Sequence, residues 1–432
     1  MDVKVNVISD SVNEVEVNLD YDEIKSEIEE AYKEERKNLT LPGFRKGKAP
    51  LAMLKKMYGE AIEYRASEKI AQKKFWDVAD EKGLKPVSTP QLVDIDFEIG
   101  KKLSFKVKYE IKPKLELKDY KGIEIEKPIF KTRDEDVEKE IEYLLKAHGT
   151  YQEAEVVEGE DFRITCNLQG LDENGNARAE ARSENMVIDL QDTKVNPQIV
   201  QNAQGKKTGE KFEFTFIDEH YHGEEKHRVE YKYEAEITKI EKLVPPEITE
   251  ELIKKISKDK ATTLDELKAE IRTNIETFYK EQSESIYTNS LLNTVVKNND
   301  FTPPPGYVEN ILTRMTEMEK ENAKRYGQNN FDEHAAMHQL QPRAEWNAKW
   351  QIILENISEA EGIKVEDADL ETLAKEEAEK TGISVEKLIK YYKDTNRPEM
   401  LLEEKVINFL KENTSIKEVD ADEKSKENKD AE

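Results

Sequence analysis

The sequence has little cysteine, no long apolar run and no excess of positive charge, and each shortage excludes a class of protein. Its 432 residues include one cysteine, Cys166, which excludes an internal disulfide framework and a cysteine-based zinc site and favours the reducing cytoplasm. The N-terminus alternates polar and apolar residues, unlike a signal peptide, and no stretch approaches the roughly 20 apolar residues of a membrane span. The net charge of −26 opposes general binding to nucleic acid or anionic lipid, so any contact with RNA must be local.

Motifs for nucleotide or metal chemistry are missing as well. The chain has no Walker loop, dinucleotide-binding fingerprint or Gly-x-Ser-x-Gly elbow. His220, His222 and His227 cluster, but no cysteine or well-spaced carboxylate completes a metal site around them. His334 and His338 are spaced as in zinc proteases, but an alanine follows the first histidine where that chemistry requires glutamate. We therefore expect no metal and no cofactor.

Successive patterns along the chain predict a multidomain α+β protein. Residues 1–112 show two strand-like stretches, two helical stretches at 21–37 and 51–82 separated by a glycine-containing loop, and two more strands. Together they describe a small α+β domain. Residues 113–149 form a linker with a connecting helix, for which Thr132 to Glu135 provide a capping-box pattern. Residues 150–243 have the period of two and the turn signals of a β-rich domain, with strands expected at 161–169, 211–217 and 229–240.

The pattern becomes helical after two consecutive prolines near residue 245. Residues 244–412 are expected to form an all-helical C-terminal domain, with a second capping box at Thr263 to Glu266. Its expected helices include residues 306–326, 333–361, 367–380, 385–394 and 398–412. Residues 413–432 are rich in Glu, Asp, Lys, Asn and Ser and are expected to be a disordered acidic tail, because they offer too little apolar surface to fold.

A glycine-flanked loop between the two N-terminal helices carries the strongest functional signal. Its residues are Gly43, Phe44, Arg45, Lys46, Gly47 and Lys48. Residues 41–60 contain five basic residues and one acidic residue, a net charge of +4 in a chain of −26. Cations beside an exposed aromatic ring suit a ribonucleoprotein surface, because they pair with phosphates or carboxylates while the ring stacks or enters an apolar niche. Taken alone, this chemistry favours a plainer structure: a turn with solvated cations and a phenylalanine packed into its own domain.

Residues 43–50 resemble the ribosome-docking signature of the bacterial trigger factor family, in the corresponding place between two helices. The resemblance extends over the whole chain in domain order and length. It implies that residues 1–112 bind the ribosome near the polypeptide exit tunnel, with Phe44, Arg45 and Lys46 contacting a ribosomal protein and nearby rRNA. It also implies an ATP-independent chaperone whose C-terminal helices shelter unfolded nascent polypeptides. Whether the protein forms a homodimer off the ribosome stays open.

The resemblance further implies that the middle domain is an FKBP-like peptidyl-prolyl isomerase. Such domains lower the roughly 18–20 kcal/mol barrier to X-Pro rotation by holding the proline ring in an aromatic pocket. The candidate pocket residues are Leu168, Val195, Ile199 and Tyr221. Tyr221 matches the family tyrosine, whereas Leu168 and Ile199 stand where the family has aromatic residues, and Asn196 and Gln198 replace an aliphatic residue and a glycine. The pocket is eroded, and we expect isomerase activity to be weak or absent.

Two other classes of function remain compatible with the sequence. One is an active peptidyl-prolyl cis-trans isomerase acting on folding chains, which requires Leu168, Ile199 and Tyr221 to line a proline pocket. The other is a structural or assembly protein that uses the loop for another purpose. Apolar residues on the C-terminal helices, such as Met315 and Met318, fit either an interhelical core or a groove for clients.

Overall fold

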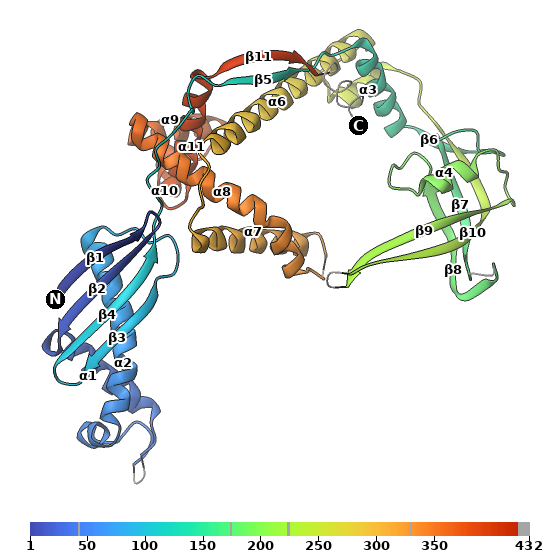
Figure 1. Cartoon of the computed structure of the whole chain (residues 1–432). Coiled ribbons are helices and arrows are strands. Elements are labelled where there is room, and N and C mark those ends of the chain that lie inside the picture. The colour runs from blue at the N-terminus through green and yellow to red at the C-terminus, as the bar shows by residue number, and fades with distance from the viewer. Residues whose placement is uncertain (42–43, 173–174, 223–224, 329, 422–432) are drawn as a thin grey trace. The chain divides into compact units, whose positions relative to one another are not determined.

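The computed structural model describes residues 1–41, 44–172, 175–222, 225–328 and 330–421 (Figure 1). They form two compact units. The first combines Met1–Pro128 with Glu284–Val419, and the second contains Ile129–Ser283 with the C-terminal end of the described chain. The fold is therefore α+β and multidomain, as the sequence predicts.

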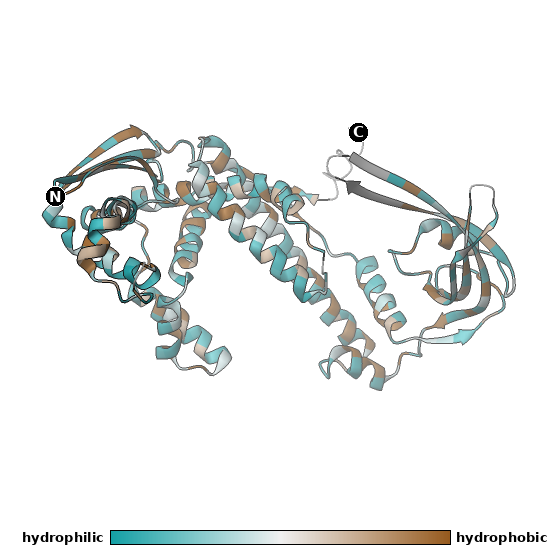
Figure 2. Ribbon diagram, turned by 90° about the horizontal axis from the view of Figure 1, so that it is seen from below, coloured by the Kyte–Doolittle hydropathy of each residue, from teal (hydrophilic) through white to brown (hydrophobic). Residues whose placement is uncertain are grey.

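The first unit begins with a four-stranded antiparallel sheet of order β1-β2-β4-β3 and two helices. Its elements are β1 (Asp2–Ser9), β2 (Val12–Asp20), α1 (Tyr21–Asn38), α2 (Leu51–Lys82), β3 (Gln91–Glu98) and β4 (Lys102–Glu110). Apolar and polar residues alternate along the strands (Figure 2). Val15 and Val17 of β2 lie opposite Val107 and Phe105 of β4, and all four are buried in one core with residues of α1 and α2. The predicted order of strands and helices is confirmed.

The first unit continues as a helical body. Its helices are the end of α6 (Leu264–Asn298), α7 (Pro305–Arg325), α8 (Glu333–Glu361), α9 (Asp367–Thr381), α10 (Val385–Lys393) and α11 (Arg397–Glu412). Tyr287, Trp350 and Val406 belong to the core that joins α6, α8 and α11. Met315 packs against the core between α7 and α8, whereas Met318 is 65% exposed. Of the two methionines, therefore, only Met315 belongs to an interhelical core. None of the described helices is both long and apolar enough to cross a membrane.

The C-terminal segment corrects one prediction. We expected disorder from residue 413, but β11 (Ser415–Asp420) pairs with β5 (Glu124–Ile129) in a two-stranded sheet. The Ser415 N–H donates to the Ile123 carbonyl at 2.8 Å. This polar segment buries little surface, and its order comes from backbone hydrogen bonds to the linker, which composition does not reveal. The remainder of the predicted tail, residues 422–432, lies outside the described residues.

The linker ahead of β5 is fastened to the helical body by two asparagines. Asn356 of α8 accepts a hydrogen bond from the Leu115 N–H at 2.8 Å. Asn299, just after α6, accepts from the Lys118 N–H at 2.6 Å and donates back to the Lys118 carbonyl at 2.9 Å. The side-chain amides therefore satisfy backbone groups that a strand partner would otherwise satisfy.

The second unit contains the β-rich middle domain. Its elements are β6 (Thr150–Glu153), β7 (Phe162–Leu171), β8 (Ala177–Asp189), α4 (Pro197–Ala203), β9 (Lys211–His222) and β10 (Glu225–Val244). The sheet has the order β6-β10-β7-β8, and β9 also pairs with β10. The sequence predicts β7, β9 and β10 but misses β6 and β8. The pairing of β8 with β7 shifts register twice, and the residues of β8 are mostly polar.

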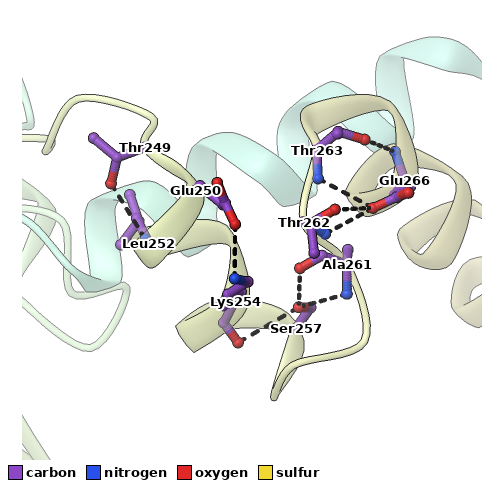
Figure 3. Close-up of polar contacts among 9 residues, drawn as sticks. All are labelled: Thr249, Glu250, Leu252, Lys254, Ser257, Ala261, Thr262, Thr263 and Glu266. Carbon is purple, nitrogen blue, oxygen red and sulfur yellow. Dashed lines mark hydrogen bonds and ion pairs between the residues drawn. The ribbon is translucent and has the colours of Figure 1, made fainter.

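A small helical layer completes the second unit: α3 (Asp134–Ala147), α5 (Glu250–Ser257) and the start of α6 (Figure 3). The second predicted capping box is confirmed, because Thr263 N–H donates to the Glu266 carboxylate at 3.1 Å and Glu266 N–H donates to Thr263 Oγ1 at 3.3 Å. The first is misplaced by one residue. Arg133, rather than Thr132, precedes α3, and its N–H donates to the Asp136 carboxylate at 2.9 Å.

Candidate functional site

The predicted docking loop joins the end of α1 to the start of α2. Both of its ends are anchored, since Leu41 is 2% exposed and Ala49 is 3% exposed in the N-terminal core. Lys48 N–H donates to the Arg45 carbonyl at 2.9 Å, which closes a turn. Gly47 has φ of +78°, a conformation that a residue with a side chain resists. The buried anchors thus hold a short turn at the tip of a helical hairpin. Gly43 lies outside the described residues.

Phe44 is partly exposed in this turn and is not a member of the N-terminal core. It keeps 37% of its surface exposed, although neighbouring Leu41 is buried. The plainer alternative, a phenylalanine packed into its own domain, is therefore not what the structure shows.

The cations of the loop differ in their ion pairing from other lysines of the same domain. Within the part of the chain that the structure describes, Arg45, Lys46 and Lys48 form no ion pair. By contrast, Lys101 and Lys102 in the same domain pair with Glu98 at 2.9 and 3.2 Å. The positive charge of the loop is thus available to a binding partner.

The structure adds two basic residues that the sequence analysis missed. A Cβ placed on Gly47 would lie 3.7 Å from the Lys37 carbonyl and 3.8 Å from the Arg36 carbonyl, so the turn folds back against the end of α1. The last turn of α1, which carries Arg36 and Lys37, therefore lies against the loop. In the sequence they look like ordinary cations in the last turn of a helix, where they complement the helix dipole.

A buried carboxylate ties α1 to α2 behind the loop. Glu63, 8% exposed, accepts hydrogen bonds from Tyr32 at 2.7 Å and Tyr21 at 2.9 Å. Burial and the hydrogen bond to Glu63 raise the pKa of Tyr21 to about 12. Lys55 lies 4.9 Å from the centre of the Tyr32 ring, and Lys74 pairs with Glu27 at 2.9 Å. These contacts fix the helical hairpin that presents the loop.

Three of the four candidate isomerase residues meet in the core of the middle domain. Leu168 of β7 and Val195, in the turn before α4, are half-buried against the cluster that contains Ile199, which is 7% exposed. Tyr221 belongs to β9, but its side chain lies outside the described residues. Leu168 and Ile199, which replace the family aromatics, therefore pack in a core that also contains Phe162, Phe212 and Phe214.

The polar replacements in the same turn bond to the sheet. Asn196 donates to the Thr215 carbonyl of β9 at 2.8 Å, and Gln198 accepts from the Thr215 N–H at 2.8 Å. The Asn196 side chain also accepts from Gln198 N–H at 2.9 Å, as an N-cap of α4. Both amides thus satisfy the outward-facing backbone groups of an edge strand.

The other candidate sites remain without supporting geometry. Among the described residues, no group of three or more His, Cys, Asp and Glu is arranged to hold a metal ion. The side chains of His220, His222 and His227 lie outside the description. Cys166 is fully buried, and burial raises the pKa of its thiol to about 11, which disfavours the reactive thiolate.

Comparison with known proteins identifies the family. Residues 1–144 match the model of the bacterial trigger factor protein, and residues 263–412 match that of its C-terminus. The trigger factor of Chloroherpeton thalassium is 32% identical over 96% of this chain and 97% of its own. The chain belongs to the trigger factor family. The trigger factor of Chlorobaculum parvum is 27% identical over 96% of this chain and 97% of its own.

A solved structure matches this chain more weakly. It was described for promiscuous substrate recognition in the folding and assembly activities of the trigger factor chaperone. It is 20% identical, covers 95% of this chain and 99% of its own, and has a TM-score of 0.42.

Family membership establishes the general function of the chain. Trigger factors are ribosome-associated chaperones that bind nascent polypeptides, and this chain is accordingly a chaperone of protein folding. The two matched ranges leave the middle domain between them.

Proposed function

We propose that this chaperone docks near the exit tunnel of the ribosome through Phe44, Arg45 and Lys46, which contact a ribosomal protein and adjacent rRNA. The observation that carries the proposal is the turn itself: an exposed ring beside cations with no ion pair in the described chain. Phosphates and carboxylates are the groups that such cations bind. Docking positions the C-terminal helices to hold emerging segments, without ATP or another cofactor.

Co-sedimentation with ribosomes tests this docking. Replacing Phe44, Arg45 and Lys46 with alanine is expected to abolish binding, because it removes the ring and two of the cations. A control variant, Lys101→Ala with Lys102→Ala, also removes two positive charges but takes them from ion-paired lysines. It is expected to bind like the parent protein. Equal binding by the triple variant and the parent would refute the proposal.

The domain ranges proposed from the sequence complete this functional scheme: 1–112 for docking, 113–149 as linker, 150–243 as isomerase-like and 244–412 for chaperone activity. Limited proteolysis followed by mass spectrometry tests them, since cleavage is expected near the boundaries. We place this activity in the cytoplasm.

The middle domain acts in this scheme as an accessory contact with weak or no isomerase activity. The hydrogen bonds of Asn196 and Gln198 to Thr215 support this, because they commit the turn of the candidate pocket to holding β9. A protease-coupled assay on a short proline peptide provides the test. Turnover close to that of efficient FKBP-type enzymes would show that the pocket still works.

A further inference from the structure

One face of helix α2 changes its role along the helix. Tyr64, Ala71 and Phe75 share that face at helical spacing. Ala71 and Phe75 are 0% and 1% exposed in the core beneath the sheet, and the Tyr64 ring meets Phe97 of β3 edge-on, with ring centres 5.7 Å apart. In this stretch the sheet buries Ala71 and Phe75, whereas it covers Tyr64 only in part, because Tyr64 is 57% exposed.

The same face continues without cover toward the loop. Met57 and Met53 precede Tyr64 by two and three turns at the same helical spacing. They are 50% and 42% exposed, and Figure 1 shows the α1–α2 hairpin extending past the end of the sheet toward the loop. Two exposed methionines thus lie on the side of the helix that buries Ala71 and Phe75 farther along.

The uncovered face is continuous with the proposed docking loop. Only buried Ala49 and the N-cap Pro50 separate Lys48 from the first turn of α2. Lys56 precedes Met57 by one position and exposed Glu60 follows it by three, and within the described residues Lys48 and Lys56 form no ion pair. A partner that covers the methionines therefore presents an apolar patch, and acidic groups at its rim on the side of the loop would meet Lys48 and Lys56.

We propose that Met53 and Met57 are a second contact of the docking surface and pack against an apolar patch on a protein of the ribosome. This inference rests on the proposed docking through residues 44–46. A protein fits better than RNA, because flexible thioether side chains pack against aliphatic and aromatic groups, whereas RNA is held through cations and stacked rings. The loop supplies charge and one ring, and α2 supplies apolar area.

The test replaces both methionines by glutamine, M53Q with M57Q, which keeps chain length and helix propensity. The control is M318Q, at a methionine that is 65% exposed on α7. We expect the ribosome dissociation constant to rise about tenfold in the double variant and to stay unchanged in the control. Thermal unfolding shows whether both variants keep the fold.

Two outcomes separate this inference from the docking proposal. If the double variant binds like M318Q while the alanine triple variant does not bind, the methionine contact is wrong and docking stands. If the triple variant binds normally, docking itself fails. A diazirine amino acid at position 57 identifies the partner: crosslinks to ribosomal protein are expected, and crosslinks to rRNA alone would overturn the assignment.

Discussion

The docking loop and the turn before α4 use their polar side chains in opposite ways. In the loop, Arg45 and Lys46 have no ion pair within the described chain and the adjacent Phe44 is exposed. In the turn, Asn196 and Gln198 both bond to Thr215. The polar groups of the loop are available to a binding partner, whereas those of Asn196 and Gln198 form hydrogen bonds with the backbone of β9. A family motif therefore indicates a binding site most clearly where its polar side chains have no partner among the described residues of the chain itself.

The largest effect on binding, as opposed to stability, is expected from the loop cations. Arg45→Ala with Lys46→Ala should weaken ribosome binding about 30-fold at moderate salt, or about 2 kcal/mol. The slope of log affinity against log salt should fall by about 2, because two cations no longer displace counterions from phosphates. Titration with labelled protein at several salt concentrations measures both quantities. A weaker affinity with an unchanged slope would show that these cations do not meet phosphate.

The turn before α4 should respond in stability. Asn196→Leu with Gln198→Gly, which approaches the family pattern, should destabilise the middle domain by about 3 kcal/mol, because both Thr215 backbone groups lose their partners. Denaturant unfolding of the full chain measures this. Gln201→Ala, on an exposed position of α4, is the control and should change stability by less than about 0.5 kcal/mol. A double variant as stable as the control would show that the hydrogen bonds of Asn196 and Gln198 do not stabilise the middle domain.

Local signals were sufficient for the helices. Helix α2 runs from Leu51 to Lys82 as predicted, because Pro50 precedes it and Gly83 ends it with φ of +66°. Helix α8 likewise has its predicted bounds, 333–361. By contrast, β11 depends on a partner strand nearly 300 residues earlier, and the composition of its own residues indicates disorder.

The candidate site was predictable only in part. The charge contrast of residues 41–60 indicated the loop, because the surrounding chain is acidic. The sequence did not indicate that Arg36 and Lys37 lie beside Gly47, since that depends on how the turn folds back. Nor did it reveal Asn196 and Gln198 as anchors of β9, because their partner is a backbone group in another element.

The hairpin that presents the loop should depend on Glu63. Tyr32→Phe should destabilise the N-terminal domain by about 2 kcal/mol, because one buried carboxylate oxygen of Glu63 loses its donor. Tyr64→Phe, at a residue that is 57% exposed, provides the control. Thermal unfolding of both variants measures the difference. Equal stability would mean that Tyr21 alone satisfies Glu63.

The smallest effect on stability is expected from the ion pair between Lys74 and Glu27. Lys74 has this partner, in contrast to Lys56 on the same helix, which forms no ion pair among the described residues. Burial alone would raise the pKa of Glu27, but hydrogen bonds from Ser26 and Lys74 outweigh it and lower this pKa from 4.5 to about 2. The pair therefore stabilises the fold above pH 4.5, and this contribution is lost as the pH falls from 4.5 toward 2. Glu27→Gln should be about 1 kcal/mol less stable than the parent at pH 6, with the difference vanishing near pH 2, whereas Glu30→Gln should track the parent throughout. Urea unfolding across this range measures the difference, and a constant gap between Glu27→Gln and the parent would mean that the ion pair is not its cause.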